Sequence, residues 1–403
     1  MSADAFAGHA RGSRGYRRVL IGLFFAGVAT FAQLYAPQAV LPFIAADLAV
    51  TPATAALAVS AATLGLTLAV IPWSLVADRV GRVPAMAAGI IVATLLGAVA
   101  PLASDIWLLL ALRFVEGVGL GAVPAVALAY LSEEVDRRFT AAAAGGYIAG
   151  TTVGGLSGRL IAGPIADIAG WRPGVWATTL LCAVAAVLFL WLVPRARGFR
   201  PQASWRGIRS RLIAPLRSPR QLALFAQGFL LMGAFVAVYN YLGFHLTAPP
   251  FLLPAWLVTM LFLAYLAGTV SSPWAGLLAS RVGRYPVLLG SIAVTVVGAL
   301  LLLAPSEWLV LLGLVVFTAG FFGAHSVASG WTPVMATPET RAQASSLYYF
   351  AYYAGSSLFG WALGVVFGEA GWGWFLVAVI AMCVLAGVVA AGLLPRHDRA
   401  AAG

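Results

Sequence analysis

The chain has 403 residues, of which 62% are hydrophobic and only 9% are charged, and its formal net charge is +11. Its mean hydropathy of +0.95 is far above that of water-soluble domains. Thirteen acidic and 24 basic residues are too few to cover the surface of a soluble protein of this length. The composition therefore excludes a soluble domain and indicates a protein whose main solvent is lipid.

Apolar stretches of membrane-spanning length follow one another along almost the whole sequence. Crossing roughly 30 Å of hydrocarbon takes about 20 helical residues. Lipid admits only helices or closed barrels, and the period-2 alternation of a barrel is absent from these stretches. We predict twelve transmembrane helices, at residues 19–44, 52–76, 84–101, 105–131, 140–167, 172–193, 221–246, 254–279, 286–304, 308–335, 342–368 and 371–394.

The first predicted helix follows four arginines and is too long for the core of a signal peptide, so we interpret it as a retained signal anchor. All 24 basic residues are Arg, and Lys is absent. With the predicted spans, 21 of them lie on one face of the membrane, whereas the opposite face has only Arg172. The positive-inside rule then predicts that the arginine-rich face and both termini are in the cytoplasm, with the protein in a bacterial inner membrane.

This topology predicts five segments in chain order. They are a cytoplasmic N-terminal arm (1–18), a six-helix bundle (19–193), a basic cytoplasmic linker (194–220), a second six-helix bundle (221–394) and a cytoplasmic tail (395–403). The linker contains eight Arg and no acidic residue, and it can be solvated or lie along anionic lipid headgroups. The topology also accounts for the positive net charge, so we expect membrane lipids and no nucleic acid among the partners.

Several kinds of chemistry are missing from the sequence. Cys182 and Cys383 both fall inside apolar spans, so neither indicates a disulfide, a metal ligand or an exposed nucleophile. No glycine-rich phosphate loop with Lys is present, which excludes direct coupling to ATP on this chain. We expect no cofactor and no metal, and energy input from an ion gradient or a partner.

The two halves of the chain share short motifs at nearly constant offsets. Pro72-Trp73 recurs 201 residues later, as does Gly170-Trp171, and the run Arg79-Val80-Gly81-Arg82 recurs 202 residues later. Two related six-helix halves are the arrangement expected when one bundle rocks against the other around a site near the membrane midplane.

The loop after the second predicted helix carries the clearest motif, which reads Ser74-Leu75-Val76-Ala77-Asp78-Arg79-Val80-Gly81-Arg82. Its second-half copy runs from Gly276 to Arg284. These motifs resemble those of the major facilitator superfamily, and the resemblance covers essentially the whole chain. It implies an all-α membrane fold of two pseudo-symmetric six-helix bundles, and a monomeric transporter of small molecules that is not an enzyme.

The resemblance assigns a gating role to this motif, although the two copies differ from the family pattern. Ser74 replaces the opening Gly in the first copy, and Ser280 replaces the Asp in the second, so only Asp78 can carry the carboxylate role. A carboxylate at a helix end can bond a neighbouring helix N-terminus and latch two bundles together. Alternatively the loop only sets topology, for which arginines suffice. The predicted gating residues are Ser74, Asp78, Arg79, Gly81, Arg82, Gly276, Arg281, Gly283 and Arg284.

Three charged residues lie inside the fourth and fifth predicted helices. Arg113 and Glu116 share a face of one helix, and Arg159 lies at a similar depth in the next, about 12 Å from the outer surface by helical rise. Charges in a membrane helix are costly and indicate function by default. The sequence leaves three hypotheses open: Glu116 exchanges a proton, Glu116 only neutralises Arg113, or Arg159 binds an anionic group of the substrate. Without an evident partner, Arg159 is expected to be answered by water, Glu116 or substrate.

Other polar residues at membrane depth are weaker candidates for lining the transport pathway. Tyr35 and Gln38 share a face of the first helix, Asn240 lies in the seventh, and His325 lies near the middle of the tenth. For His325, packing is the alternative to proton transfer. The eleventh helix carries Tyr348, Tyr349, Tyr352 and Tyr353, for which helix packing and substrate contact both remain open.

Within the superfamily, the sequence resembles the acriflavine-sensitivity or arabinose-efflux-like branch. The segments that carry this resemblance are Tyr35-Ala36-Pro37-Gln38, Ala129-Tyr130-Leu131-Ser132-Glu133-Glu134 and Gly154-Gly155-Leu156-Ser157-Gly158-Arg159. The branch implies proton-driven antiport that exports a small organic molecule, a drug or a metabolite, and so multidrug resistance. Uptake of a nutrient is the first alternative. A membrane-embedded enzyme is the second, and it would need a catalytic pair or a metal cluster at depth.

Overall fold

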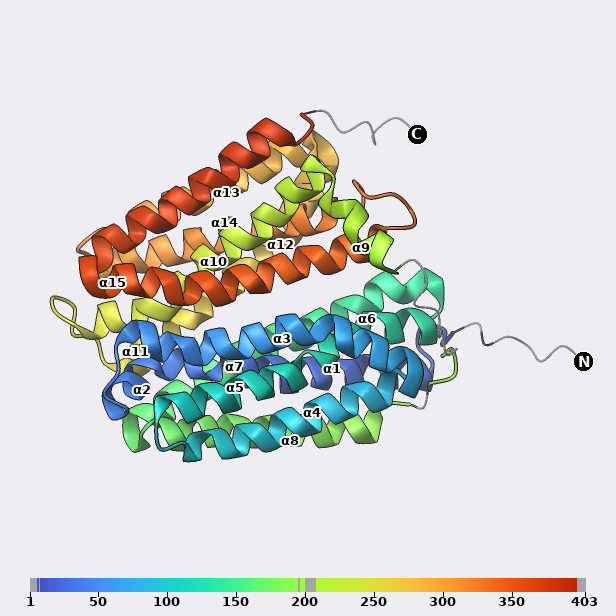
Figure 1. Cartoon of the computed structure of the whole chain (residues 1–403), viewed down its shortest axis with the longest axis horizontal. Coiled ribbons are helices and arrows are strands. Elements are labelled where there is room, and N and C mark those ends of the chain that lie inside the picture. Colours follow the sequence, from blue (N-terminus) through green and yellow to red (C-terminus); the bar gives the residue numbers. More distant parts are fainter. Residues whose placement is uncertain (1–5, 7, 195, 200–207, 397–403) are drawn as a thin grey trace, which may run out of the picture. The chain divides into compact units, whose positions relative to one another are not determined.

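The computed structural model describes residues 6, 8–194, 196–199 and 208–396 of the chain (Figure 1). These residues are nearly all helical, and the one β pairing recorded among them is an isolated bridge between His9 and Val135. The α-helices of the first half are α1 (Arg14–Tyr35), α2 (Leu41–Asp47), α3 (Pro52–Val80), α4 (Arg82–Val99), α5 (Ile106–Leu120), α6 (Ala122–Glu134), α7 (Thr140–Ala169) and α8 (Trp171–Leu192). The remaining α-helices are α9 (Ile208–Leu216), α10 (Pro219–Thr247), α11 (Ala255–Met260), α12 (Tyr265–Val282), α13 (Arg284–Leu301), α14 (Glu307–Trp331) and α15 (Arg341–Leu393). Short 3₁₀ segments are η1 (Ala36–Val40), η2 (Ala100–Leu102), η3 (Arg137–Phe139) and η4 (Leu261–Ala264).

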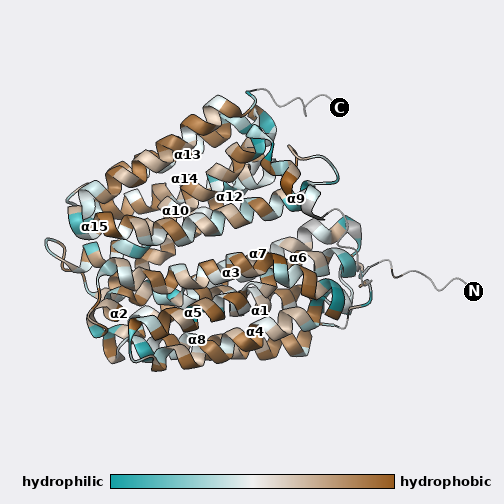
Figure 2. Ribbon diagram, in the orientation of Figure 1, coloured by the Kyte–Doolittle hydropathy of each residue, from teal (hydrophilic) through white to brown (hydrophobic). Residues whose placement is uncertain are grey.

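Each predicted span coincides with helical structure, which confirms the all-α membrane fold. Ten helical segments of the described residues are long and apolar enough to cross a membrane. One of them, α15, contains a break at Gly371, whose φ of +76° lies outside the helical range, at the boundary predicted between the last two spans. Helix α7 covers the fifth predicted span with 30 residues but is not one of the ten. Hydrophobic residues cover the helices, and hydrophilic residues gather at helix ends and loops (Figure 2).

Some spans are interrupted where the sequence disfavours a continuous α-helix. Between α1 and α2 the chain tightens into η1, which contains Pro37, and Pro42 follows at the start of α2. A 3₁₀ segment inside a longer helix often marks a hinge or a functional site, because it breaks the regular hydrogen-bond ladder. The interruption places Gln38 in the irregular segment and leaves Tyr35 as the last residue of α1.

The chain forms two compact units. Unit 1 comprises Met1–Val50 and Ala61–Ser204, and unit 2 comprises Thr51–Ser60 and Trp205–Gly403, so α3 is shared between them. The predicted linker, 194–220, is partly helical, since it contains α9. Helix α9 packs against α10 and α15. Residues 195 and 200–207 of that linker, residues 1–5 and 7 of the arm, and residues 397–403 of the tail lie outside the described residues.

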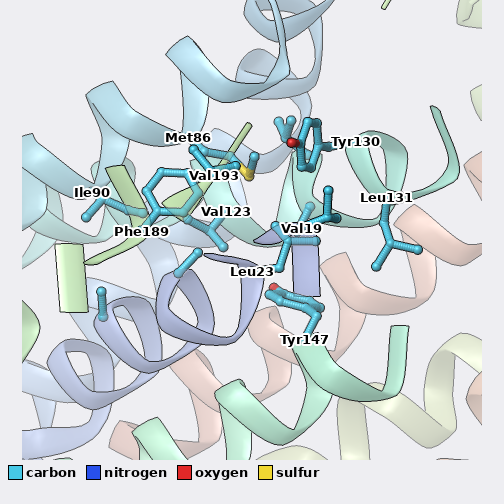
Figure 3. Packing of buried hydrophobic residues seen from close by; sticks show 14 of the residues in the cluster. Val19, Leu23, Met86, Ile90, Val123, Tyr130, Leu131, Tyr147, Phe189 and Val193 are labelled. Atoms are coloured by element: carbon cyan, nitrogen blue, oxygen red, sulfur yellow. The ribbon is translucent and has the colours of Figure 1, made fainter. Parts of the chain in front are cut away.

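Unit 1 has a core of buried apolar side chains near one end of its helices (Figure 3). Helix α7 packs closely on α1 through a row of glycines: a Cβ added to Gly154 or to Gly158 would lie 2.7 Å or 2.5 Å from the backbone of α1. Small residues spaced by four let membrane helices approach to backbone contact. This close approach brings Arg159, the residue after Gly158, next to the end of α1.

Candidate functional site

Unit 1 holds a buried ion pair between Arg113 and Glu116 of α5. Arg113 Nη1 lies 2.7 Å from Glu116 Oε2, and the two side chains are 3% and 0% exposed. The spacing of three residues places both groups on one face of the helix, as the sequence predicted. The cost of burying each charge is partly offset by the other.

Arg113 also bonds the backbone of α1. Its guanidinium donates to the carbonyl of Gln33 at 3.3 Å and to that of Leu34 at 2.8 Å. The amide of Gln33 donates to Thr179 Oγ1 at 3.3 Å. Among the described atoms, Glu116 Oε1 is a buried oxygen without a hydrogen-bond partner. Arg113 is thus satisfied by three acceptors, whereas the carboxylate it faces is not fully satisfied.

Arg159 of α7 contacts Tyr35 at the end of α1, Gln38 in η1, and the backbone of its own helix. Its Nε and Nη2 donate to Gln38 Oε1 at 2.8 Å and 2.6 Å, and its Nη1 donates to the Gly155 carbonyl at 2.7 Å. The guanidinium carbon lies 4.6 Å from the ring centroid of Tyr35, within the range of a cation–π contact. Arg159 therefore has protein acceptors in Gln38 and Gly155, which the sequence did not reveal, and the binding of an anionic substrate group by Arg159 stays a prediction.

Both buried arginines therefore converge on residues 33–38, the end of α1 and the start of η1. Arg113 and Glu116 form one set of contacts on this segment, and Arg159 forms a second set with Tyr35 and Gln38. We call these five residues, together with Gln33, the buried network of unit 1. Gln33 is the member that sequence reasoning missed. Its signal was available: it is an amide in an apolar helix, one helical turn before Pro37.

The other two pathway candidates lie in unit 2. Asn240 of α10 donates to the carbonyl of Gly360 at 3.3 Å and is buried. His325 of α14 is hydrogen-bonded through Nδ1 to the hydroxyl of Tyr348 at 2.9 Å. The rings of Phe321 and Tyr352 lie 6.0 Å and 4.8 Å from the His325 ring. His325 is therefore embedded among aromatic side chains, and Asn240 belongs to a separate set of contacts.

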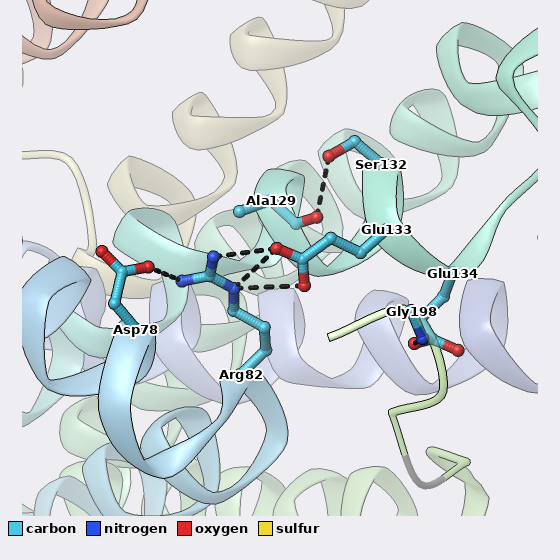
Figure 4. Close-up of polar contacts among 7 residues, drawn as sticks. All are labelled: Asp78, Arg82, Ala129, Ser132, Glu133, Glu134 and Gly198. Atoms are coloured by element: carbon cyan, nitrogen blue, oxygen red, sulfur yellow. Dashed lines mark hydrogen bonds and ion pairs between the residues drawn. The ribbon is translucent and has the colours of Figure 1, made fainter. Parts of the chain in front are cut away.

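The first loop motif forms an ion-pair chain across three helix ends (Figure 4). Arg82 Nη1 lies 2.5 Å from Asp78 Oδ1, and Arg82 Nη2 lies 2.8 Å from Glu133 Oε1 at the end of α6. Gly81 has a φ of +102°, a conformation that residues with a side chain rarely adopt, and it turns the chain from α3 into α4. Glu133 had no predicted role, although it was part of the branch motif. We call the end of unit 1 that carries this network the motif end.

The second copy keeps the turn and loses the carboxylate. Gly283 has a φ of +94°, but the hydroxyl of Ser280 donates to the Leu277 carbonyl within its own helix. A Cβ at Gly276 would meet no atom within 4 Å, so no close helix contact depends on that glycine in unit 2. Arg281 is exposed and Arg284 is half-buried. In the first copy, Ser74 is half-buried and Arg79 is exposed.

Outside the membrane segments, one acid near the motif end has a shifted pKa. Hydrogen bonds from the Arg138 side chain and backbone lower the pKa of Asp136 to about 2. Asp47, at the end of α2, lies in a separate set of contacts. It accepts a bond from Trp171 Nε1 at 3.0 Å and pairs with Arg172 Nη1 at 2.5 Å. No group of three potential metal ligands was found among the described residues.

Comparisons with known proteins agree with this architecture. The chain is 39% identical over 383 residues to the inner membrane transport protein YnfM of Escherichia coli (strain K12), covering 94% of this chain and 91% of that protein. It is 33% identical to the uncharacterized MFS-type transporter YybF of Bacillus subtilis (strain 168), covering 96% and 95%. Among solved structures, the nucleoside transporter NupG matches with a TM-score of 0.77 at 14% identity, over 94% of this chain and 100% of that one.

The family model described as Major Facilitator Superfamily matches residues 23–252 and 247–403. Together with the whole-length relatives and the helical fold, this match means that the chain is a multi-pass membrane transporter that belongs to the Major Facilitator Superfamily.

Proposed function

We propose that this transporter exports a small organic molecule, a drug or a metabolite, in exchange for protons by alternating access. In this proposal Glu116 carries the coupled proton. The moving bodies are the bundles 19–193 and 221–394, joined by the linker 194–220. The transporter acts as a monomer in a bacterial inner membrane, with both termini in the cytoplasm.

The observation that carries the proposal is the unequal satisfaction of the buried pair. Arg113 has two backbone carbonyls as acceptors besides Glu116, so it keeps hydrogen bonds when the carboxylate is neutralised. Glu116 is fully buried and has one oxygen without a hydrogen-bond partner among the described atoms. A pair built only for neutralisation would leave Arg113 poorly satisfied after protonation of Glu116. The arrangement instead suits a carboxylate that gains and loses a proton.

Partial relatives support transport of small organic molecules in either direction. The multidrug resistance protein MdtG of Enterobacter lignolyticus is 27% identical over 59% of this chain. The 4-hydroxybenzoate transporter PcaK of Pseudomonas aeruginosa is 28% identical over 37% of it. Their names are consistent with export and with transport of an organic acid, respectively.

Uptake of an anionic nutrient together with a proton is the second candidate, and the buried cation Arg159 favours it. A proton on Glu116 makes the network more positive, which strengthens the binding of an anion and weakens the binding of a cation. Exchange against protons therefore suits a cationic substrate, whereas symport suits an anionic one. In both cases Tyr35, Gln38, Asn240 and His325 are proposed to lie along the substrate pathway.

The direction of coupling can be tested in proteoliposomes that contain the purified protein. Ethidium serves as the cationic probe and 4-hydroxybenzoate as the anionic probe, each with an imposed pH gradient of either sign. We expect ethidium to move opposite to the proton gradient. Accumulation of 4-hydroxybenzoate along the proton gradient, with no movement of ethidium, would reject export and establish the second candidate.

The role of Glu116 is tested by the change Glu116→Gln, which mimics the protonated carboxyl group. We expect a stable protein that binds and exchanges the transported probe but no longer responds to the pH gradient, because the amide releases no proton. A Glu116→Gln protein that still concentrates the probe would remove Glu116 from the proton pathway.

The proposed orientation is tested by cysteine labelling in a background with Cys182→Ser and Cys383→Ser. Positions in the 194–219 loop should react only with reagent on the cytoplasmic side, and a cysteine next to Glu307 only with reagent outside. Labelling of the linker from outside would overturn the orientation.

A further inference from the structure

The chain that leaves α8 does not run free at the motif end of unit 1 but lies on the end of α6. We call residues 194 and 196–199 the linker clamp. The hydroxyl of Tyr130 donates to the Pro194 carbonyl at 3.0 Å. Ala196 packs against the buried apolar cluster of unit 1. The first residues of the linker are therefore packed against unit 1.

Glu134 is the main polar anchor of the linker clamp. Its Oε1 accepts from the backbone N–H of Arg197 at 2.6 Å and from that of Gly198 at 2.7 Å, and its side chain is fully buried. Two successive backbone N–H groups form a concave site for an anion, and such charge-assisted bonds are stronger than neutral ones. Burying a carboxylate costs free energy, and a linker that only joined two bundles would not need this contact.

The approach of the linker to α6 is close enough to require a glycine. A Cβ on Gly198 would lie 2.1 Å from the Glu133 carbonyl oxygen, well inside contact distance. Gly198 and Glu134 lie together beside the Arg82–Glu133 pair (Figure 4). The backbone, rather than a side chain, thus makes the contact at this point.

The next linker residue reaches the gating motif itself. The guanidinium carbon of Arg82 lies 5.5 Å from the ring centroid of Phe199, within cation–π range. Arg82 is the residue that bridges Asp78 and Glu133. The two neighbouring glutamates therefore have different partners. Glu133 binds Arg82, and Glu134 binds the linker clamp, whose Phe199 contacts the same arginine.

The N-terminal arm docks on the same helix end. The backbone N–H of His9 donates to the Glu134 carbonyl at 2.7 Å, and the N–H of Asp136 donates to the His9 carbonyl at 3.3 Å. Arm, linker and motif loop thus meet at one helix terminus.

We propose that the linker clamp is a working part of the first-half gating motif. Glu134 fixes it on α6, and Phe199 then holds Arg82 in the position that bridges Asp78 and Glu133. Glu134 and Phe199 are positioning residues for the gate. The inference rests on the proposed gating role of the Asp78 loop and is independent of substrate and of proton coupling. It makes the linker clamp an element that moves with the gate rather than a passive connection.

The anchor is tested by the reactivity of a cysteine at position 196. In a background with Cys182→Ser and Cys383→Ser, Ala196→Cys is partly covered and should react slowly with a maleimide. Adding Glu134→Ala should raise the rate by about tenfold or more, because two charge-assisted bonds are lost. Glu134→Gln should restore protection, since its amide oxygen accepts the same two bonds. Ser132→Ala is the matched control, because the Ser132 hydroxyl bonds only its own helix at Ala129.

The link to the gate is tested by distances between spin labels at Val80→Cys and Val282→Cys, which occupy equivalent exposed positions in the two motif copies. We expect Glu134→Ala and Phe199→Ala to shift the distance distribution in the direction that Asp78→Asn does, and Phe199→Tyr and Ser132→Ala to leave it unchanged. Continued protection of Ala196→Cys in the Glu134→Ala protein would reject Glu134 as the anchor. Raised reactivity with an unshifted distance distribution would show that the linker has no part in the gate.

Discussion

The two units bury different kinds of polar residue. Among the described residues, the buried charged side chains all lie in unit 1, and they are Arg113, Glu116, Glu134 and Arg159. The polar side chains buried in unit 2 beyond α3 are uncharged, and they are Gln221, Gln227, Asn240, Thr259, Thr295, Thr318, Thr332, Ser356 and Ser357. Charges at membrane depth are costly and are kept for function. The difference teaches that duplicated halves can share a fold while only one of them buries carboxylate and guanidinium groups among the described residues.

The loop motifs repeat this contrast at the helix ends. Gly81 and Gly283 have nearly the same backbone angles, with φ of +102° and +94°. Asp78 joins an ion-pair chain, whereas Ser280 bonds only its own helix. The turn geometry has therefore been retained without the charge, so the glycine serves the turn and the carboxylate serves something further.

The largest expected effect comes from removing the cation of the buried pair. Arg113→Gln leaves Glu116 as a buried charge without its ion-pair partner, which costs about 3–5 kcal/mol in measured cases. We expect strongly reduced expression and a lower midpoint of thermal unfolding in detergent. Gln227→Leu, which removes a buried amide of unit 2, should cost much less.

The double change Arg113→Gln with Glu116→Gln sharpens this prediction. It removes both charges, so most of the lost stability should return, while transport driven by a pH gradient should not. If the double variant were as unstable as Arg113→Gln alone, the pair would not be the source of the destabilisation.

A smaller loss of stability is expected where His325 lies among the aromatic side chains of unit 2. His325→Leu removes the partner of the Tyr348 hydroxyl, and an unsatisfied buried hydroxyl costs about 1–3 kcal/mol. We expect a lower unfolding midpoint with proton coupling intact, measured as transport per imposed pH unit. His325→Leu combined with Tyr348→Phe should recover stability. Loss of coupling in both variants would place the proton pathway in unit 2 and break the contrast between the units.

A still smaller effect separates the two motif copies. Asp78→Asn keeps the shape and loses one charge-assisted contact, so we expect a folded protein whose conformational equilibrium shifts by about 1 kcal/mol. Ser280→Ala should have little effect. Reagent accessibility of exposed cysteines near each loop measures both shifts, and equal shifts would mean that the loops only set topology.

The fold was predictable from sequence because lipid restricts the choice. Apolar runs of sufficient length must be helices, so the helix positions followed from composition, and the boundary predicted between the last two spans coincides with the break at Gly371. The grouping of Arg113 with Glu116 followed from helical periodicity, because both residues lie on one helix.

Contacts between helices that are distant in sequence were not predictable in the same way. Gln38 faces Arg159 because α7 approaches α1 through its glycines, and no local pattern gives that register. Glu134 is a polar residue at a helix end, which the sequence cannot distinguish from a solvated acid. Only the position of the linker explains its burial.

The smallest expected effect compares the acids of two loops outside the membrane segments. The Arg138 side chain lowers the pKa of Asp136 to about 2, whereas a backbone hydrogen bond, ahead of Thr337 and Arg341, lowers the pKa of Glu339. A lowered pKa in the folded state stabilises the protein above the unfolded pKa, near 4, and that contribution is lost as the pH falls toward the folded value. The midpoint of thermal unfolding should therefore fall slightly as the pH is lowered from 5 to 3, the range in which these groups begin to take up protons.

Asp136→Asn should reduce this shift of the midpoint. Added salt should also reduce the shift in the native sequence, because the Asp136–Arg138 pair is exposed and screened. Glu339→Gln should remove a part that responds less to salt. If salt affected both parts equally, the arginine would not be the main cause of the low pKa of Asp136.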